Sequence, residues 1–279
     1  MPGQTPLNQI GTSCSVLLRT LESARDMFGS SKSTAACGAA IMLASRDTPA
    51  SASAGALVAA LCQGGLAEVT ESDGEFGGQR LPLVHAKTNS PRLATLTLQS
   101  ARSFEGVMLS GPIKLYLEQS GEVAYAPDPT HGSLCAVVQA ETTPDDAWIR
   151  RLANAAGCEP SALTLVVAPQ DRMLGAAQIA GRMNENMIFT MERSLGLDVS
   201  GVVSIEGDAP VCPPGAKTKR GKILLPDDYL HYGAKAKLTL APGSGLDAES
   251  LARDLAFSSL SVFGGLFIDL LEQAGVVGP

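Results

Sequence analysis

The sequence predicts an α/β or α+β fold with two lobes of similar size. Segments with strand and helix patterns alternate along the chain, although many connections between them are irregular. The 279 residues, 45% of them hydrophobic and 18% charged, suffice to bury a substantial core. A segment at residues 125–132 separates the halves. We therefore expect an N-terminal lobe at residues 1–128 and a C-terminal lobe at residues 129–279, with exchange of segments between the lobes allowed.

The N-terminal half begins with helical spacing. Apolar residues three or four apart predict a helix over residues 7–28, which a polar turn at 30–34 follows. Small apolar residues at 35–44 favour a buried strand. The remaining elements expected in this half, in chain order, are a helix at 48–61, a strand at 66–71, a turn-rich loop at 71–78, a strand at 81–87, a helix at 93–101 that starts after a proline, and a turn at 110–112.

The C-terminal half continues the alternation of strands and helices. A strand at 135–140 and a helix at 144–156 precede a second buried strand at 163–168. A Met-rich helix, described below, follows this strand. The elements expected after it are a strand at 201–206, a proline-rich loop at 207–215, a strand at 229–240 and a mostly helical segment at 248–271 that is broken at two glycines.

Composition and charge exclude several classes of protein. The formal net charge of −7 argues against binding to nucleic acid, which needs a basic surface, and would suit a cationic small substrate. The six cysteines form no CxxC pair and the three histidines are scattered, so no metal site is expected. The sequence shows no secretory signal, and its longest apolar runs, 35–44 and 54–62, are too short to span a membrane. We expect a cytoplasmic protein with reduced, mostly buried thiols and no membrane partner.

One polar stripe runs along the Met-rich helix after residue 175. At 3.6 residues per turn, Gln178, Arg182, Glu185 and Phe189 share one face, while the opposite face is apolar. The guanidinium of Arg182 would hold the carboxylate of Glu185 ionised and in place, and such a carboxylate could orient and deprotonate a water molecule. From spacing alone, a solvated surface pair of little consequence is the more common outcome.

Short motifs that follow one another in a fixed order resemble those of a known family. The central one joins the segment 165–169 to Gly175, Gln178, Arg182 and Glu185. The others, in chain order, are Gly55, Cys62-Gln63-Gly64-Gly65-Leu66, the segment from Ser90-Pro91 to Gln99, Ser110-Gly111-Pro112, Gly207-Asp208-Ala209-Pro210, Asp228 and Tyr232-Gly233. Together they span about residues 35–240. By these motifs the chain resembles the methenyltetrahydromethanopterin cyclohydrolases.

The resemblance implies a function and a set of site residues. The family adds water to the cationic methenyl bridge of a tetrahydromethanopterin-type one-carbon carrier, a reduced pterin, and gives the formyl form. By resemblance, the pterin lies in a cleft between the lobes, no metal or separate cofactor is needed, and the protein is a homo-oligomer, typically a trimer. Arg182 and Glu185 map onto the family's catalytic pair. The residues expected to bind substrate are Gln178, Ser110, Gly111, Pro112, Lys114, Gly64, Gly65 and Asp228.

Three departures from the family pattern leave alternatives open. Lys114 stands where the family has an arginine, and a lysine cannot copy the bidentate recognition of an arginine. Residues 224–228 lose another arginine of the family and gain Pro226. The chain also stops at Pro279, without the family's C-terminal segment. An altered paralogue that binds a reduced pterin or a precursor without turnover is therefore an alternative to a cyclohydrolase, as is a non-catalytic subunit of an oligomer.

Overall fold

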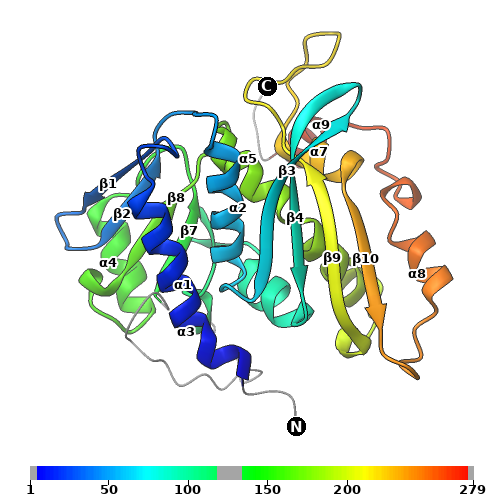
Figure 1. Cartoon of the computed structure of the whole chain (residues 1–279), viewed down its shortest axis with the longest axis horizontal. Coiled ribbons are helices and arrows are strands. Elements are labelled where there is room, and N and C mark those ends of the chain that lie inside the picture. Colours follow the sequence, from blue (N-terminus) through cyan, green and yellow to red (C-terminus); the bar gives the residue numbers. More distant parts are fainter. Residues whose placement is uncertain (1–4, 118–133, 276–279) are drawn as a thin grey trace.

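Two β-sheets lie side by side and helices pack around them (Figure 1). The computed structural model describes residues 5–117 and 134–275. A six-stranded mixed sheet has the strand order β1-β2-β8-β7-β6-β5, and a four-stranded sheet has the order β10-β9-β4-β3. The mixed α/β class predicted from the sequence is therefore confirmed.

The six-stranded sheet has a parallel centre and antiparallel edges. Strand β8 pairs in parallel with β2 on one side and with β7 on the other. One apolar cluster covers each face of the sheet, with α1 and α2 on one side and α4 on the other. Burial on both faces explains why the central strands are almost continuously apolar. The strands are β1 (Ser30–Thr34), β2 (Ala40–Ala44), β5 (Arg102–Phe104), β6 (Val107–Ser110), β7 (Cys135–Gln139) and β8 (Thr164–Val167).

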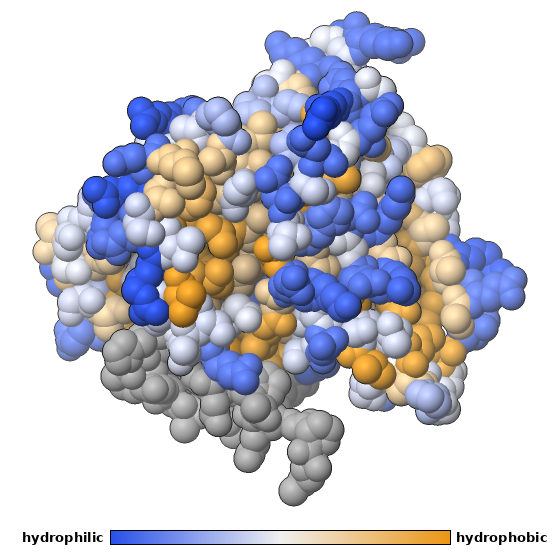
Figure 2. All heavy atoms as spheres, viewed as in Figure 1, coloured by the Kyte–Doolittle hydropathy of each residue, from blue (hydrophilic) through white to orange (hydrophobic). Residues whose placement is uncertain are grey.

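The four-stranded sheet is antiparallel throughout. Its strands are β3 (Ala67–Phe76), β4 (Gln79–Thr88), β9 (Val202–Pro210) and β10 (Lys235–Leu240). Gly77 and Gly78 form the two-residue turn between β3 and β4, and both have a positive φ, as this hairpin type requires. The outer face carries charged side chains, for example Lys87 and Lys237, which both pair with Glu206. Figure 2 shows hydrophilic residues across this face.

Helices α2 and α5 pack against each other between the two sheets (Figure 1). Gly55 makes this packing possible, because a Cβ at this position would lie 2.4 Å from the Cβ of Ala177. The helical segments are α1 (Thr5–Ser23), α2 (Ser51–Cys62), the π-helix η1 (Leu93–Gln99), α3 (Lys114–Leu117), α4 (Asp146–Ala155), η2 (Pro160–Ala162), α5 (Met173–Ala180), α6 (Met183–Phe189), η3 (Thr190–Ser194), η4 (Val199–Gly201), α7 (Pro226–Gly233), α8 (Ala248–Asp254), η5 (Phe257–Ser259) and α9 (Phe267–Gln273). Within the described ranges, none of these helices combines the length and the apolar character needed to cross a bilayer.

Several local predictions were wrong. The segment 30–34, expected as a turn, is the edge strand β1, and four of its five residues are exposed, so it carries no apolar alternation. The expected loop at 71–78 continues β3 to Phe76, and β9 runs to Pro210 into the expected proline-rich loop. The expected strand at 229–240 begins with α7, because Pro226 occupies the first helical turn and the Asp228 carboxylate accepts the N–H of the preceding Leu225.

The expected boundary between the lobes, at residues 128 and 129, lies outside the described residues. On either side of it, the chain contributes to both sheets. Strands β1, β2, β5 and β6 precede the boundary and join β7 and β8, while β3 and β4 join β9 and β10. Each sheet therefore depends on contacts between segments that are distant in the sequence.

We expect the substitution Gly55→Ala to lower the free energy of unfolding by about 1–3 kcal/mol. Alanine normally favours a helix over glycine by about 1 kcal/mol, but the contact with α5 outweighs that gain. Urea unfolding measures the change. As a control, Gly265→Ala, whose Cβ would meet only one backbone atom at 3.3 Å, should change stability little. Equal stability of both variants would show that the helices are not tightly packed here.

The buried thiols give a pH dependence of stability. Burial raises the pKa of Cys14 and of Cys62 to about 12. In the unfolded chain such thiols titrate near pH 8.5. Between these values the folded state holds protons that the unfolded state has lost, so stability is full below about pH 8.5 and falls as the pH rises. Urea unfolding at pH 8 to 10.5 should give Cys14→Ala a shallower fall than wild type. An equal fall of the free energy of unfolding with pH in wild type and in Cys14→Ala would contradict the prediction.

Candidate functional site

The single Met-rich helix predicted after residue 175 is in fact two helices, α5 and α6. Gly181 ends the first and Arg182 begins the second. A Cβ at Gly181 would lie 2.6 Å from the Cβ of Ala59 on α2, so the chain needs glycine at this point. The N–H of Arg182 donates to Ile179 O at 2.9 Å, which tightens the turn. The prediction of one stripe along a continuous helix is therefore wrong, and Phe189 at its far end is 43% exposed.

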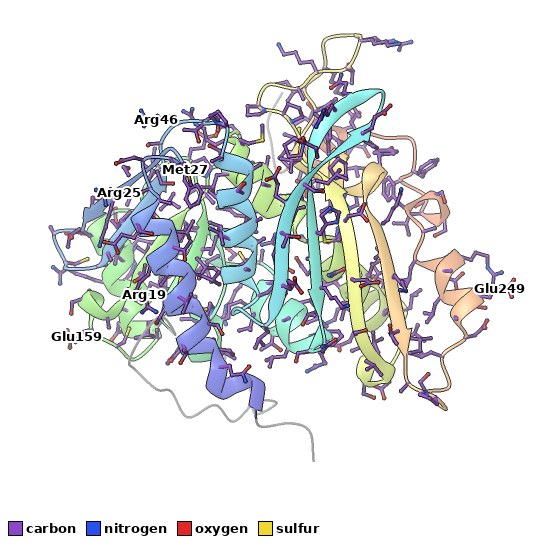
Figure 3. The ribbon with its side chains drawn as sticks, viewed as in Figure 1. Arg19, Arg25, Met27, Arg46, Glu159 and Glu249 are labelled. Carbon is purple, nitrogen blue, oxygen red and sulfur yellow. The ribbon has the colours of Figure 1, made fainter. Side chains whose placement is uncertain are left out.

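Arg182 and Glu185 form a buried ion pair. Arg182 Nη1 donates to Glu185 Oε2 at 2.7 Å, and only 9% and 10% of the two side chains are exposed. The interpretation as a solvated surface pair is therefore wrong. Peripheral acids look different: Glu159 and Glu249 are exposed and point away from the body of the molecule at opposite edges (Figure 3). The burial fixes the geometry of the Arg182–Glu185 pair and still leaves it within reach of water.

Ser110 is the second partner of Arg182. It ends β6, and Arg182 Nη2 donates to its Oγ at 2.8 Å. Gly111 follows with φ +101°, a conformation that favours glycine, and its N–H donates to Leu98 O at 2.8 Å. Arg182 Nε has no hydrogen-bond partner among the described residues. Two segments that were predicted separately, the Ser-Gly-Pro turn and the Arg-Glu pair, therefore meet at one guanidinium.

Gln178 is fully buried and bonds to a thiol and to a second glutamine. Its Nε2 donates to Cys62 Sγ at 3.4 Å, and its Oε1 accepts from Gln139 Nε2 at 3.2 Å. Burial raises the pKa of Cys62 to about 12 and outweighs the opposite influence of nearby Arg182. Cys62 therefore stays a protonated thiol at neutral pH and is no candidate for a nucleophile.

This arrangement is suited to chemistry on a bound water molecule. Glu185 offers a carboxylate held by a guanidinium, and the guanidinium offers fixed positive charge beside it. The hydroxyl of Ser110 accepts from Arg182, so its own proton is available to another acceptor. Among the described residues, no group of three or more His, Cys, Asp and Glu side chains is placed to hold a metal ion.

Comparison with known proteins identifies the family. The family model for the cyclohydrolases (MCH) matches residues 10–276. A protein of Methanococcus maripaludis named methenyltetrahydromethanopterin cyclohydrolase is 31% identical over 249 residues, which cover 85% of this chain and 76% of that protein. Its namesake from Methanocaldococcus jannaschii is 30% identical over 257 residues, with the same two coverages. The chain belongs to the methenyltetrahydromethanopterin cyclohydrolase family.

Lys114 of this cyclohydrolase family member contacts the backbone. Its Nζ donates to Leu96 O at 3.1 Å and to Ser100 O at 2.7 Å, at the end of η1, and the residue is buried. The ammonium group thus satisfies carbonyl groups that the end of a helix leaves without partners. A substrate contact of Lys114 stays a prediction.

Gly64, Gly65 and Asp228 also have structural contacts. The two glycines, with φ of +65° and +68°, follow α2 where a Cβ would approach Leu98 and Ser13 within 2.6 Å and 2.4 Å. Both carboxylate oxygens of Asp228 accept backbone N–H groups, from Leu225 at 2.8 Å and from Phe267 at 2.7 Å. These hydrogen bonds tie α7 to the start of α9. Binding roles for the three residues stay predictions.

No motif of the sequence marked Asp227 as a residue near the site. Burial raises its pKa, against the opposite influence of His231 and Arg182, so its carboxyl group lies within the electrostatic reach of the ion pair. The only signal in the sequence was the spacing of four residues to His231 on one helix. The neighbouring acid, Asp228, drew the prediction because the family motif contains it.

Two cavities of the described part of the chain do not include the ion pair. One of about 550 Å³ is lined by apolar residues of α6, α7, β10 and α8, among them Met187, Leu238 and Leu251. The other, of about 480 Å³, lies on the outer face of the four-stranded sheet. Neither is lined by Arg182 or Glu185. The cleft between lobes implied by the resemblance stays a prediction.

Breaking the buried ion pair should destabilise the protein. We expect Glu185→Ala to lower the free energy of unfolding by about 3–5 kcal/mol, because it leaves a buried guanidinium without its carboxylate. The double variant Arg182→Met/Glu185→Leu should lose less than the two single changes combined. As a control, Arg151→Ala breaks an exposed pair with Glu105 and should cost about 1 kcal/mol or less. Additive losses in urea unfolding would mean that the pair is solvated.

Proposed function

We propose that the protein hydrates the methenyl bridge of a tetrahydromethanopterin-type one-carbon carrier to give the formyl form. The observation that carries the proposal is the buried Arg182–Glu185 pair bonded to Ser110. The resemblance assigns catalytic roles to the same two residues. Membership of the family and relatives named for this activity support the substrate class. The proposal needs no metal or separate cofactor, and it includes a homo-oligomer in the cytoplasm.

The chemistry requires little beyond a placed water molecule and a proton acceptor. The methenyl carbon is electrophilic because two nitrogens share its positive charge. The water oxygen bonds to this carbon while Glu185 accepts a proton. In the resulting carbinolamine, one carbon–nitrogen bond breaks, the nitrogen gains a proton and the carbon becomes a formyl group. One proton is released overall, so charge and atoms balance.

Arg182 and its second partner, Ser110, have distinct tasks in this proposal. Arg182 holds the carboxylate of Glu185 in orientation. It also stabilises the water oxygen as it becomes the hydroxyl oxygen of the carbinolamine. Ser110 fixes the second Nη of Arg182 and keeps a hydroxyl proton for a hydrogen bond to the same oxygen. The negative charge of Glu185, and the net charge of −7 of the chain, favour a cationic substrate over a neutral product.

One observation favours a second candidate function, a paralogue that binds a reduced pterin or its precursor without turnover. The family pattern has an arginine where this chain has Lys114, and the Lys114 ammonium donates to two backbone carbonyls. A substrate contact made by that arginine would then be absent. The intact pair of Arg182 and Glu185 favours the enzyme.

The loss of near-ultraviolet absorbance on hydration of the methenyl carrier tests the proposal. Wild type should accelerate this loss, and Glu185→Gln should lower kcat about 10²- to 10⁴-fold because the proton acceptor is gone. A matched control is Glu192→Gln, since Glu192 also pairs with an arginine, Arg92, at 2.8 Å. The kcat of Glu192→Gln should stay within about twofold of that of wild type. Wild-type turnover at the background rate would refute the hydrolase, and tight binding without turnover would support the paralogue.

A further inference from the structure

The C-terminal turn of η1 contacts both segments that meet at the guanidinium. Towards the Ser110 turn, Leu98 O accepts from the N–H of Gly111, and Leu96 O accepts from Lys114. Towards the helix break, Gln99 Nε2 donates to Gly181 O at 2.9 Å. The same turn of backbone therefore holds the strand end that carries Ser110 and the break that precedes Arg182. A π-helical turn at such a place is often associated with a functional site.

Gln99 has a contact that packing alone does not require. The residue is fully buried, and the carbonyl it binds lies in the peptide that joins Gly181 to Arg182. The end of a helix leaves carbonyl groups that need donors from elsewhere, and Gln99 supplies one across 82 positions of sequence. Its amide therefore fixes the plane of the peptide from which Arg182 starts.

We propose that Gln99 is a positioning residue for the reaction proposed above. By holding the Gly181 carbonyl, it fixes the break between α5 and α6 and so directs Arg182 towards Ser110 and Glu185. This inference rests on the proposed function for its catalytic consequence. Its structural part, the control of the helix break, can be measured without any turnover.

Because the arginine side chain is long, the orientation of its backbone strongly affects where the guanidinium lies. Both hydrogen bonds of Arg182, at 2.7 and 2.8 Å, are formed at the tip of a long side chain. A small rotation of the peptide at its base moves the tip further than the base itself. Hydrogen bonds weaken steeply once distance and angle depart from their preferred values. Fixing the backbone peptide of Arg182 therefore keeps the tip of its side chain aligned with both Ser110 and Glu185.

Two buried atoms beside this peptide have hydrogen-bonding capacity left. Gln99 Oε1 and Arg182 Nε have no partner among residues 5–117 and 134–275. One is an acceptor and the other is a donor. Buried polar atoms of native proteins are nearly always paired, with protein, water or ligand. Each of these two atoms can therefore take part in one further hydrogen bond, for example with a bound water molecule.

The experiment compares Gln99→Leu with Gln63→Leu. Both glutamines are fully buried. Within the described ranges both have an Oε1 without a partner, and the only hydrogen bond of Gln63 Nε2 there is to Ala59 O on its own helix. We expect similar losses of thermal stability in the two variants. Only Gln99→Leu should lower kcat, by about 10- to 100-fold, with little change in KM, because misplaced catalytic groups slow the chemical step more than binding. A kcat within twofold of wild type, or an equal loss in Gln63→Leu, would overturn the proposal.

The variant Gln99→Glu adds a pH signature. When protonated, the introduced carboxyl group can donate to the Gly181 carbonyl in place of the amide. When ionised it cannot donate, and it places a negative charge beside Arg182 that competes with Glu185. The ratio of its kcat to that of wild type should therefore fall as pH rises through the pKa of the introduced group. A ratio that is independent of pH would argue for a purely steric role and against the proposal.

Hydrogen–deuterium exchange tests the structural part independently of activity. In Gln99→Leu the amides of residues 181–189 should exchange at least several-fold faster than in wild type, while Gln63→Leu should leave them unchanged. This readout stands even if wild type fails to hydrate the methenyl carrier, which would refute the proposed function alone. Unchanged exchange in Gln99→Leu would overturn the positioning role whatever the activity shows.

Discussion

The ion pair between Arg182 and Glu185 is the contact on which the site depends. A guanidinium and a carboxylate that are largely removed from water must be paired, because an unpaired buried charge costs several kcal/mol. Here the guanidinium is shared between Glu185 and Ser110, at 2.7 and 2.8 Å. The first turn of α6, which carries Arg182 and Glu185, and the end of strand β6, which carries Ser110, must therefore keep their relative positions. Much of the surrounding structure acts to hold those positions.

Two kinds of contact keep the segments of the site in their relative positions. Small residues let elements approach closely: Gly55 and Gly181 remove the side chains that would separate α2 from α5 and from the helix break. Buried polar side chains then fix directions: Gln99 donates from η1 to the carbonyl of Gly181, and Lys114 donates to carbonyl groups at the end of η1. Close packing sets where the elements lie, and these hydrogen bonds set how the ends of the elements are oriented.

The residues expected at the site divide into two groups by their partners. Ser110, Arg182 and Glu185 bond to one another through side chains. Lys114 and Asp228 instead donate to or accept from backbone groups at the ends of helical segments. A motif records which residues recur, but a polar side chain recurs equally well when it supports the backbone. The contacts therefore distinguish candidates for chemistry from supports for the fold.

The sequence by itself determined the mixed α/β class, the apolar central strands β2, β7 and β8, and the Arg-Glu pair, because these depend on local spacing and composition. It did not determine the edge strand β1 or the break at Gly181. Only the tertiary structure decided these, and it also decided that the ion pair is buried. The physical reason is that each depends on contacts with distant segments: a neighbouring strand, the Cβ of Ala59, or the hydroxyl of Ser110. Local patterns carry no information about such partners.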